Sequence, residues 1–110
     1  MKIKFIGHWK KHNEWHEISS ITPRSVEFFA ADTVSLDEVD LYINTGFKTS
    51  KREEILVGDT ILIETKDYTY KATVMFTGKD FVVYIDKQGF KYLRDLLSKS
   101  VRSRLVDVRA

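Results

Sequence analysis

The sequence predicts a mainly β protein with one short C-terminal α-helix. Polar and apolar residues alternate over several short runs, as they do in half-buried strands. Those runs are rich in β-branched and aromatic residues, and turn-forming residues separate them. The chain has 110 residues, the length of one domain, and its 43% apolar content is enough to fill a hydrophobic core.

The chain is expected to begin with a β-hairpin extension. Residues 2–6 alternate between polar and apolar, and residues 15–21 form a second predicted strand after a polar, turn-forming stretch. Folding the chain about His12 places Trp9 opposite Trp15. We therefore expect the two tryptophans to form a cross-strand pair.

Two more strands are predicted before the middle of the chain. Pro23 interrupts the pattern, and residues 25–30 then resume it. Residues 39–43 alternate again, and we expect residues 44–46, Asn-Thr-Gly, to end that strand. Residues 31–40 are acidic and give no clear pattern.

The clearest β region is a meander of three strands joined by tight turns. Its strands are predicted at residues 60–65, 68–76 and 81–85. A turn at Gly58-Asp59 leads into it, in which Gly supplies backbone freedom and Asp bonds to neighbouring amides. Meanders entered in this way are common in small barrels, so we expect a Src-homology-3-like or related β-barrel.

The end of the chain changes character. Phe90, Leu93, Leu96 and Leu97 fall on one helical face, which predicts a helix from Phe90 to Ser98. A closing strand is expected over residues 104–108. The single predicted domain, residues 1–110, then has three parts: 1–46 with the N-terminal strands and hairpin, 54–86 with the meander, and 89–110 with the helix and closing strand.

Composition points to a reducing compartment. Cysteine is absent, which excludes disulfides, thiolate nucleophiles and cysteine metal sites. The first residues lack the apolar stretch of a signal peptide, and no run approaches the ~18–20 apolar residues of a membrane span. We expect a cytoplasmic protein with no membrane partner.

The formal net charge of +2 conceals an uneven layout. Residues 1–13 carry +4, residues 14–67 carry −7 and residues 87–110 carry +5. This layout fits oriented association with a charged partner. It equally fits basic ends that lie beside the acidic middle and neutralise it.

Three segments carry a resemblance to a known family. They are Ile3-Lys4-Phe5 with Trp9 and Trp15-His16-Glu17, then Tyr42–Lys48 followed by Glu54–Ile61, and lastly a Leu-rich segment before Leu105–Val108. Together they resemble the YopX family of phage and prophage proteins, and the second segment is the most specific. Ile6-Gly7-His8 stand where the family usually has Arg-Ala, and the usual Val-Ile-Gly-Asn-Ile ending is absent.

The resemblance implies a phage origin and a β-barrel-type fold. It implies no shared reaction or cofactor. Short phage proteins of this kind often bind host proteins, counter restriction or CRISPR nucleases, or serve phage development.

Two charged segments are the candidate contact sites. The acidic one holds Asp32, Asp37, Glu38 and Asp40, and the basic tail holds Lys91, Arg94, Lys99, Arg102 and Arg104, with Arg109 beyond them. The acidic residues lack the spacing of an EF-hand, so they form either a solvated loop or a surface that imitates nucleic-acid phosphates. The basic residues either face solvent or lie along phosphates. In the second case the barrel could supply exposed stacking residues from among its aromatic side chains, Tyr68, Tyr70, Phe76, Phe81 and Tyr84.

No motif predicts catalysis. The five glycines are scattered and form neither a phosphate loop nor a nucleophile elbow. His8, His12 and His16 would share a face of a helix and could then ligate a metal, but the predicted hairpin makes them exposed turn and strand residues. We therefore predict no enzyme, no catalytic residue, no cofactor and no metal.

The function predicted first is that of a non-enzymatic phage accessory protein. It would bind a host or phage protein and inhibit a host-defence or nucleic-acid enzyme. The alternative is direct nucleic-acid binding through the basic tail. A second copy of the chain stays open as a partner.

Overall fold

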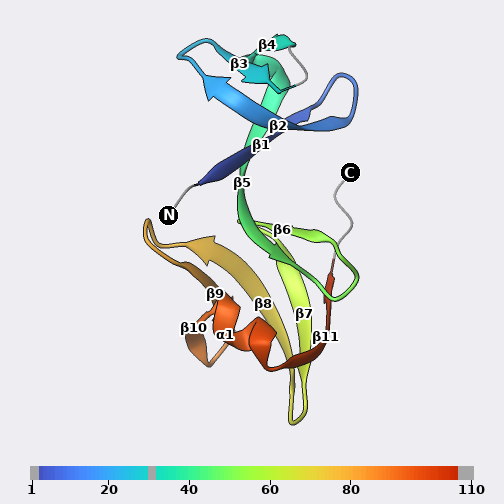
Figure 1. The fold of residues 1–110 in the computed structure, drawn as a ribbon. Coiled ribbons are helices and arrows are strands. Elements are labelled where there is room, and N and C mark those ends of the chain that lie inside the picture. Colours follow the sequence, from blue (N-terminus) through green and yellow to red (C-terminus); the bar gives the residue numbers. More distant parts are fainter. Residues whose placement is uncertain (1–2, 30–31, 107–110) are drawn as a thin grey trace. The chain divides into compact units, whose positions relative to one another are not determined.

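The computed structural model describes residues 3–29 and 32–106 (Figure 1). Within them the protein is mainly β, with eleven strands, one 3-10 helix and one α-helix. The chain forms two compact units, an N-terminal unit up to Asn44 and a C-terminal unit from Thr45 onward. Strand β5 (Val39–Lys48) belongs to both, since its first part lies in one unit and its end in the other.

The N-terminal unit is an antiparallel sheet with the strand order β4-β3-β2-β1-β5. Its elements are β1 (Lys4–Trp9), β2 (Glu14–Ile21), β3 (Ser25–Phe28), β4 (Thr33–Ser35), the 3-10 helix η1 (Leu36–Glu38) and the first part of β5. Alternate residues of β3 are buried, because Val26 and Phe28 point to the same side of the sheet. They form a core with Val34 and Val39, against which Trp9 and other apolar residues pack.

The C-terminal unit contains a five-stranded antiparallel sheet with the order β10-β9-β8-β7-β11. Its elements are β6 (Glu54–Leu56), β7 (Thr60–Thr65), β8 (Thr69–Phe76), β9 (Phe81–Ile85), β10 (Gly89–Tyr92), α1 (Leu93–Ser98) and β11 (Ser100–Leu105). The predicted meander is confirmed as β7–β9. So is the turn that leads into it, where the Asp59 carboxylate accepts a hydrogen bond of 2.8 Å from the Leu56 N–H.

The five-stranded sheet has an inner and an outer face. Ile61, Ile63, Ala72, Val74 and Val83 are buried on the inner face, each at most 1% exposed. Lys71, Thr73 and Met75 alternate with the buried residues of β8 and are exposed on the outer face.

Helix α1 joins the two edge strands of this sheet. It follows β10 at one edge and leads to β11 at the other, and it lies against β9, β10 and β11. Leu93 and Leu96 are 0% and 5% exposed, so they fix the helix to the core. No helix in the described part of the chain is long and apolar enough to cross a membrane.

The N-terminal hairpin forms as predicted, but its register is shifted by one residue. Trp9 lies opposite Glu14, and Trp15 lies opposite His8. The turn contains four residues and ends at Asn13, whose φ of 51° is left-handed. Because the turn has an even number of residues, its centre lies between two residues rather than on one, and the expected Trp9–Trp15 pair is wrong.

Strand β5 does not end where the sequence suggested. Residues 44–46 continue it, and Gly46 has a φ of +81° within the strand. The Thr45 hydroxyl donates a hydrogen bond of 2.7 Å to the Ile55 carbonyl oxygen, which ties β5 to β6. Polar residues that resemble a turn, Asn44 and Thr45, are thus buried in the sheet.

The C-terminal elements also begin and end differently. The helix starts at Leu93, because residues 90–92 pair with β9 as strand β10 and Phe90 is 63% exposed. The closing strand is Ser100–Leu105, and residues 107–110 lie outside the described part. The expected barrel closure is not observed, since β10 and β11 remain separate edges of the described sheet.

Gly7 allows close packing in the N-terminal unit. A Cβ atom there would lie 2.9 Å from Val39 Cγ1, 3.0 Å from Phe28 Cε1 and 3.2 Å from Ile18 Cδ1. Three core side chains therefore occupy the space that any larger residue would need.

Gly7→Ala should lower the free energy of unfolding by about 1–3 kcal/mol through overpacking. At an open strand position the same change would raise it by about 0.4–1 kcal/mol, because the unfolded chain would lose freedom. Urea denaturation measures the difference. Combining the change with Val39→Ala, which removes the nearest methyl group, should cost less than the sum of the two single changes. An alanine variant as stable as the parent would show that this space is open.

Candidate functional site

The structure divides the predicted basic tail between two faces of the C-terminal sheet. Lys91 pairs with buried Val83 and therefore projects from the inner face, and Lys99 ends helix α1 on the same side. Arg102 and Arg104 pair with Glu64 and Leu62 and project from the outer face. The tail is thus two separate basic surfaces.

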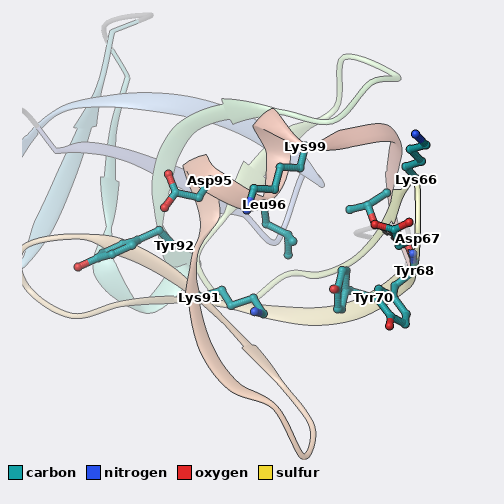
Figure 2. A pocket seen from close by; sticks show the side chains of 10 residues that line it. Lys66, Asp67, Tyr68, Tyr70, Lys91, Tyr92, Asp95, Leu96 and Lys99 are labelled. Carbon is teal, nitrogen blue, oxygen red and sulfur yellow. Dashed lines mark hydrogen bonds between the residues drawn. The ribbon is translucent and has the colours of Figure 1, made fainter.

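A hollow with a volume of about 670 Å³ lies on the inner side of the C-terminal unit. We call it the cleft (Figure 2). One wall is the β7–β8 turn, and the other is formed by β10 and α1. Its lining residues are Thr65, Lys66, Asp67, Tyr68, Tyr70, Lys91, Tyr92, Asp95, Leu96 and Lys99. This volume lies within the range of small-molecule sites.

The first wall is held by a tight hairpin turn. Thr65 donates from its N–H to the Tyr68 carbonyl oxygen at 2.7 Å. Its hydroxyl group also accepts from the Tyr68 N–H at 3.1 Å and donates to the same carbonyl at 3.0 Å. These bonds fix the two-residue tip, Lys66-Asp67, and with it the position of Tyr68 at the rim.

The floor and the second wall follow from strand register. Tyr70 pairs with Ile63, which is buried on the inner face, so Tyr70 projects from that face and is half-buried. Figure 2 shows Lys91 extending along the cleft toward Tyr70. Leu96 anchors α1, and this places Lys99 at the top of the second wall.

The cleft combines cations with aromatic rings. Lys66, Lys91 and Lys99 are exposed, as are two of its three tyrosines, with Tyr68 at 66% and Tyr92 at 51%. The rings of Tyr68 and Tyr70 lie 6.0 Å apart at an angle of 48°. Two acids also line the cleft, so three ammonium groups stand against two carboxylates. Asp95 is 4.0 Å from Arg94 Nε, a contact between exposed groups that stabilises little.

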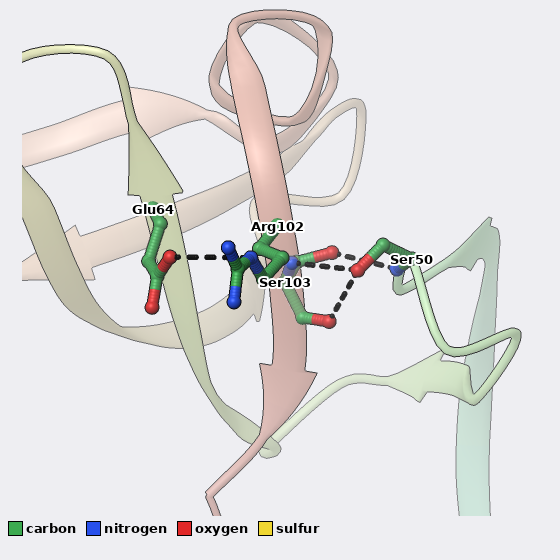
Figure 3. Close-up of polar contacts among 4 residues, drawn as sticks. All are labelled: Ser50, Glu64, Arg102 and Ser103. Carbon is green, nitrogen blue, oxygen red and sulfur yellow. Dashed lines mark hydrogen bonds and ion pairs between the residues drawn. The ribbon is translucent and has the colours of Figure 1, made fainter.

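The outer basic surface, which carries Arg102 and Arg104, is held in place by hydrogen bonds between two serines (Figure 3). Arg102 Nε lies 3.7 Å from Glu64 Oε2 in an exposed ion pair. Ser50 Oγ accepts from the Ser103 N–H at 2.9 Å and donates to the Ser103 carbonyl oxygen at 2.9 Å. The Ser50 N–H in turn donates to Ser103 Oγ at 2.8 Å. These bonds satisfy the Ser103 N–H and carbonyl group at the edge of β11 that does not pair with β7.

A hollow of about 390 Å³ accompanies this surface. It is lined by Ser50, Lys51, Leu62, Glu64, Arg102, Ser103 and Arg104. Three of these residues are cationic and none is aromatic. The hollow therefore offers charge to an anion but no ring on which a base could stack.

The predicted acidic segment is divided among the connection before β4, the 3-10 helix η1 and strand β5. Asp32 lies before β4, whereas Asp37 and Glu38 lie after it in η1, so the three-residue strand separates them. Asp40 follows in β5, 3.7 Å from Lys10 Nζ. One exposed ion pair thus joins the acidic middle to the basic N-terminal segment, which fits the interpretation that the basic ends lie beside that middle.

The three histidines are engaged locally within the hairpin. His8 stacks on Trp15 with ring centroids 4.4 Å apart, and His12 meets the Trp9 ring edge-on at 4.3 Å. His16 Nε2 lies 2.8 Å from Glu14 Oε2. Within residues 3–29 and 32–106, no three His, Asp or Glu side chains are arranged to hold a metal ion.

The N-terminal unit carries an apolar groove of about 440 Å³. It is lined by Ile3, Lys4, Phe5, Glu17, Ile18, Ser19, Ser20, Ile21 and Phe29. Phe29 is 71% exposed and Ile21 is 43% exposed. Exposed apolar side chains that share one groove are typical of contact surfaces.

Sequence reasoning found part of the cleft. It singled out Lys91 and Lys99 and named Tyr68 and Tyr70 as stacking candidates, but it missed Lys66 and Tyr92. Tyr92 was assigned to the helix, and Lys66 was noted only as a turn residue. The sequence feature that could have identified Lys66 is a two-residue hairpin turn, Lys66-Asp67, directly followed by Tyr68.

Comparison with known proteins identified no relative: no family model, no curated protein and no solved structure matches this chain.

Ser50→Ala should lower the free energy of unfolding by about 1–3 kcal/mol, because it leaves the Ser103 N–H and carbonyl group without partners. Ser103 is 5% exposed, so little water can replace them. Urea denaturation measures the loss, and amide exchange should be faster at Ser103. Ser19→Ala is the matched control, since Ser19 is exposed and donates one bond, to the Glu27 carbonyl oxygen. Equal stability of the two variants would show that the hydrogen bonds from Ser50 to the Ser103 backbone do not stabilise the edge of β11.

Proposed function

We propose that the protein is a non-enzymatic binding protein whose cleft takes single-stranded nucleic acid. The observation that carries the proposal is the convergence of three lysines and three tyrosines around one hollow of about 670 Å³. Proteins that bind single strands combine a basic groove for the phosphates with aromatic rings for the bases. Binding is the activity that these residues support.

The two walls have different roles in this proposal. Lys91 and Lys99 contact phosphates, because they place two ammonium groups on the wall formed by β10 and α1. Tyr68 at the rim of the opposite wall and Tyr70 on the floor hold a base, because their rings lie close enough to act together. The tight turn at Thr65 keeps that wall in place before a ligand arrives, so little conformational entropy is lost on binding.

The double variant Lys91→Ala/Lys99→Ala should weaken binding of a fluorescent oligothymidine about 10- to 100-fold at low salt. It should also reduce the slope of log affinity against log salt by about 1.4, since each neutralised phosphate contributes about 0.7 for single strands. Fluorescence anisotropy at about 50 and 200 mM salt measures both quantities.

The control is Lys11→Ala/Lys48→Ala, which removes the same charge from exposed positions outside both the cleft and the hollow beside β10. It should change affinity and slope far less. Equal losses of affinity in the two double variants would show that the effect comes from net charge and not from the cleft. Absence of binding by the parent protein at low salt would refute the proposal.

The apolar groove of the N-terminal unit favours a second candidate function, contact with another protein. In this proposal the chain is a YopX-like phage or prophage accessory protein in the bacterial cytoplasm. The groove binds an apolar segment of a host-defence or nucleic-acid enzyme and thereby inhibits that enzyme. Phe29 is the anchor, because it is the most exposed large apolar side chain among the described residues.

Phe29→Glu should abolish capture of such a partner by the tagged protein in a bacterial host, because it places a charge in an apolar contact. Val101→Glu is the matched control, since Val101 is 65% exposed in the C-terminal unit. Stoichiometric partners in pull-downs from cells provide the measurement. Capture that is unchanged in Phe29→Glu but lost when Asp37, Glu38 and Asp40 are replaced by Ala would transfer the contact to the acidic segment.

A further inference from the structure

A second hollow adjoins the cleft across the edge strand β10. Its volume is about 330 Å³, and its lining residues are Thr77, Asp80, Val82, Phe90, Lys91 and Tyr92. Lys91 and Tyr92 line both hollows. Strand β10 is an edge of the sheet, and neighbouring residues of a strand project from opposite faces. Lys91 projects from the inner face and Tyr92 from the outer face, so the two residues flank this edge on both sides. The two hollows therefore meet at β10.

The outer face beside this hollow is aromatic. Phe90 pairs with Tyr84, and their ring centroids lie 5.3 Å apart at an angle of 56°. Phe90 is 63% and Tyr84 is 41% exposed, and neighbouring Met75 is 42% exposed. Exposed rings on one end of a sheet face form a platform on which bases of any sequence can stack.

We propose that a single strand bound in the cleft passes Lys91 and Tyr92 and continues onto the outer face, where a further base stacks on Phe90 and Tyr84. This inference rests on the proposed function of the cleft. The shared lining residues give a path, Lys91 gives a cation at the crossing, and the aromatic pair gives a contact beyond it. The path bends around the edge of a sheet, which suits a flexible single strand and excludes a duplex with its persistence length of about 150 base pairs.

The test compares oligothymidines of two lengths. One of about 4 nucleotides fills the cleft, and one of about 12 nucleotides also reaches the outer face, within the span of site sizes known for small single-strand binders. Phe90→Ala should weaken binding of the longer oligonucleotide about 5- to 100-fold, as expected for the loss of one stacked base. It should leave the affinity for the shorter one unchanged. Phe29→Ala removes a ring of similar exposure from the N-terminal unit and should affect neither length.

Each outcome distinguishes this inference from the proposal on which it rests. If Lys91→Ala/Lys99→Ala weakens binding as expected while Phe90→Ala has no effect on either length, the cleft binds nucleic acid and the outer path is wrong. If Phe90→Ala weakens both lengths equally, Phe90 belongs to the cleft contact and the path is again wrong. If the parent protein binds neither length at low salt, both proposals fail. If a fluorescent poly-glutamate peptide binds in place of the oligonucleotides and depends on Phe90, the surface recognises an acidic protein segment.

Discussion

The C-terminal unit depends on a short connection that must cross from one edge of a sheet to the other. Five strands spaced ~4.8 Å apart place the outer two about 19 Å from each other along the sheet, whereas a six-residue helix is only about 9 Å long. The sheet therefore has to curve so that α1 can join β10 to β11, and the curved inner face shelters the core. Burial of Leu93 and Leu96 holds the crossing in place. One wall of the cleft is a direct product of this crossing.

An open sheet leaves edges that must be protected from pairing with other chains. The two edges of the five-stranded sheet are protected in different ways. At β11, the Ser50 hydroxyl group forms hydrogen bonds with the N–H and the carbonyl group of Ser103. Glu53 accepts a hydrogen bond of 3.1 Å from the Leu105 N–H. At β10, the strand is only four residues long and carries a lysine at its third position. The lysine that makes β10 a poor partner for another strand also lines both hollows.

The sequence predicted best where local chemistry decides the structure. Strands β7 and β9 have the expected bounds, since β-branched runs between tight turns leave few alternatives. It failed where long-range contacts decide. Residues 44–46 look like a turn, yet a hydrogen bond from Thr45 to Ile55 keeps them in a strand, and Phe90 fits a helical face but pairs with Tyr84. The cleft was predictable only in part for the same reason. Lys91 and Lys99 were visible as a basic cluster, whereas their position opposite the β7–β8 turn depends on strand order, which periodicity does not encode.

The serine bonds at the edge of β11 also bear on the order of folding. They join residues that are 53 positions apart in the chain. Closing so long a loop is entropically costly, so contacts of this kind tend to form after local hairpins such as β7–β8. One wall of the cleft is then present early, as part of a hairpin, and the other is added only when the last described strand docks. A molecule that touches both walls would therefore bind the completed sheet and slow its opening, while partly folded chains would present only half of the surface.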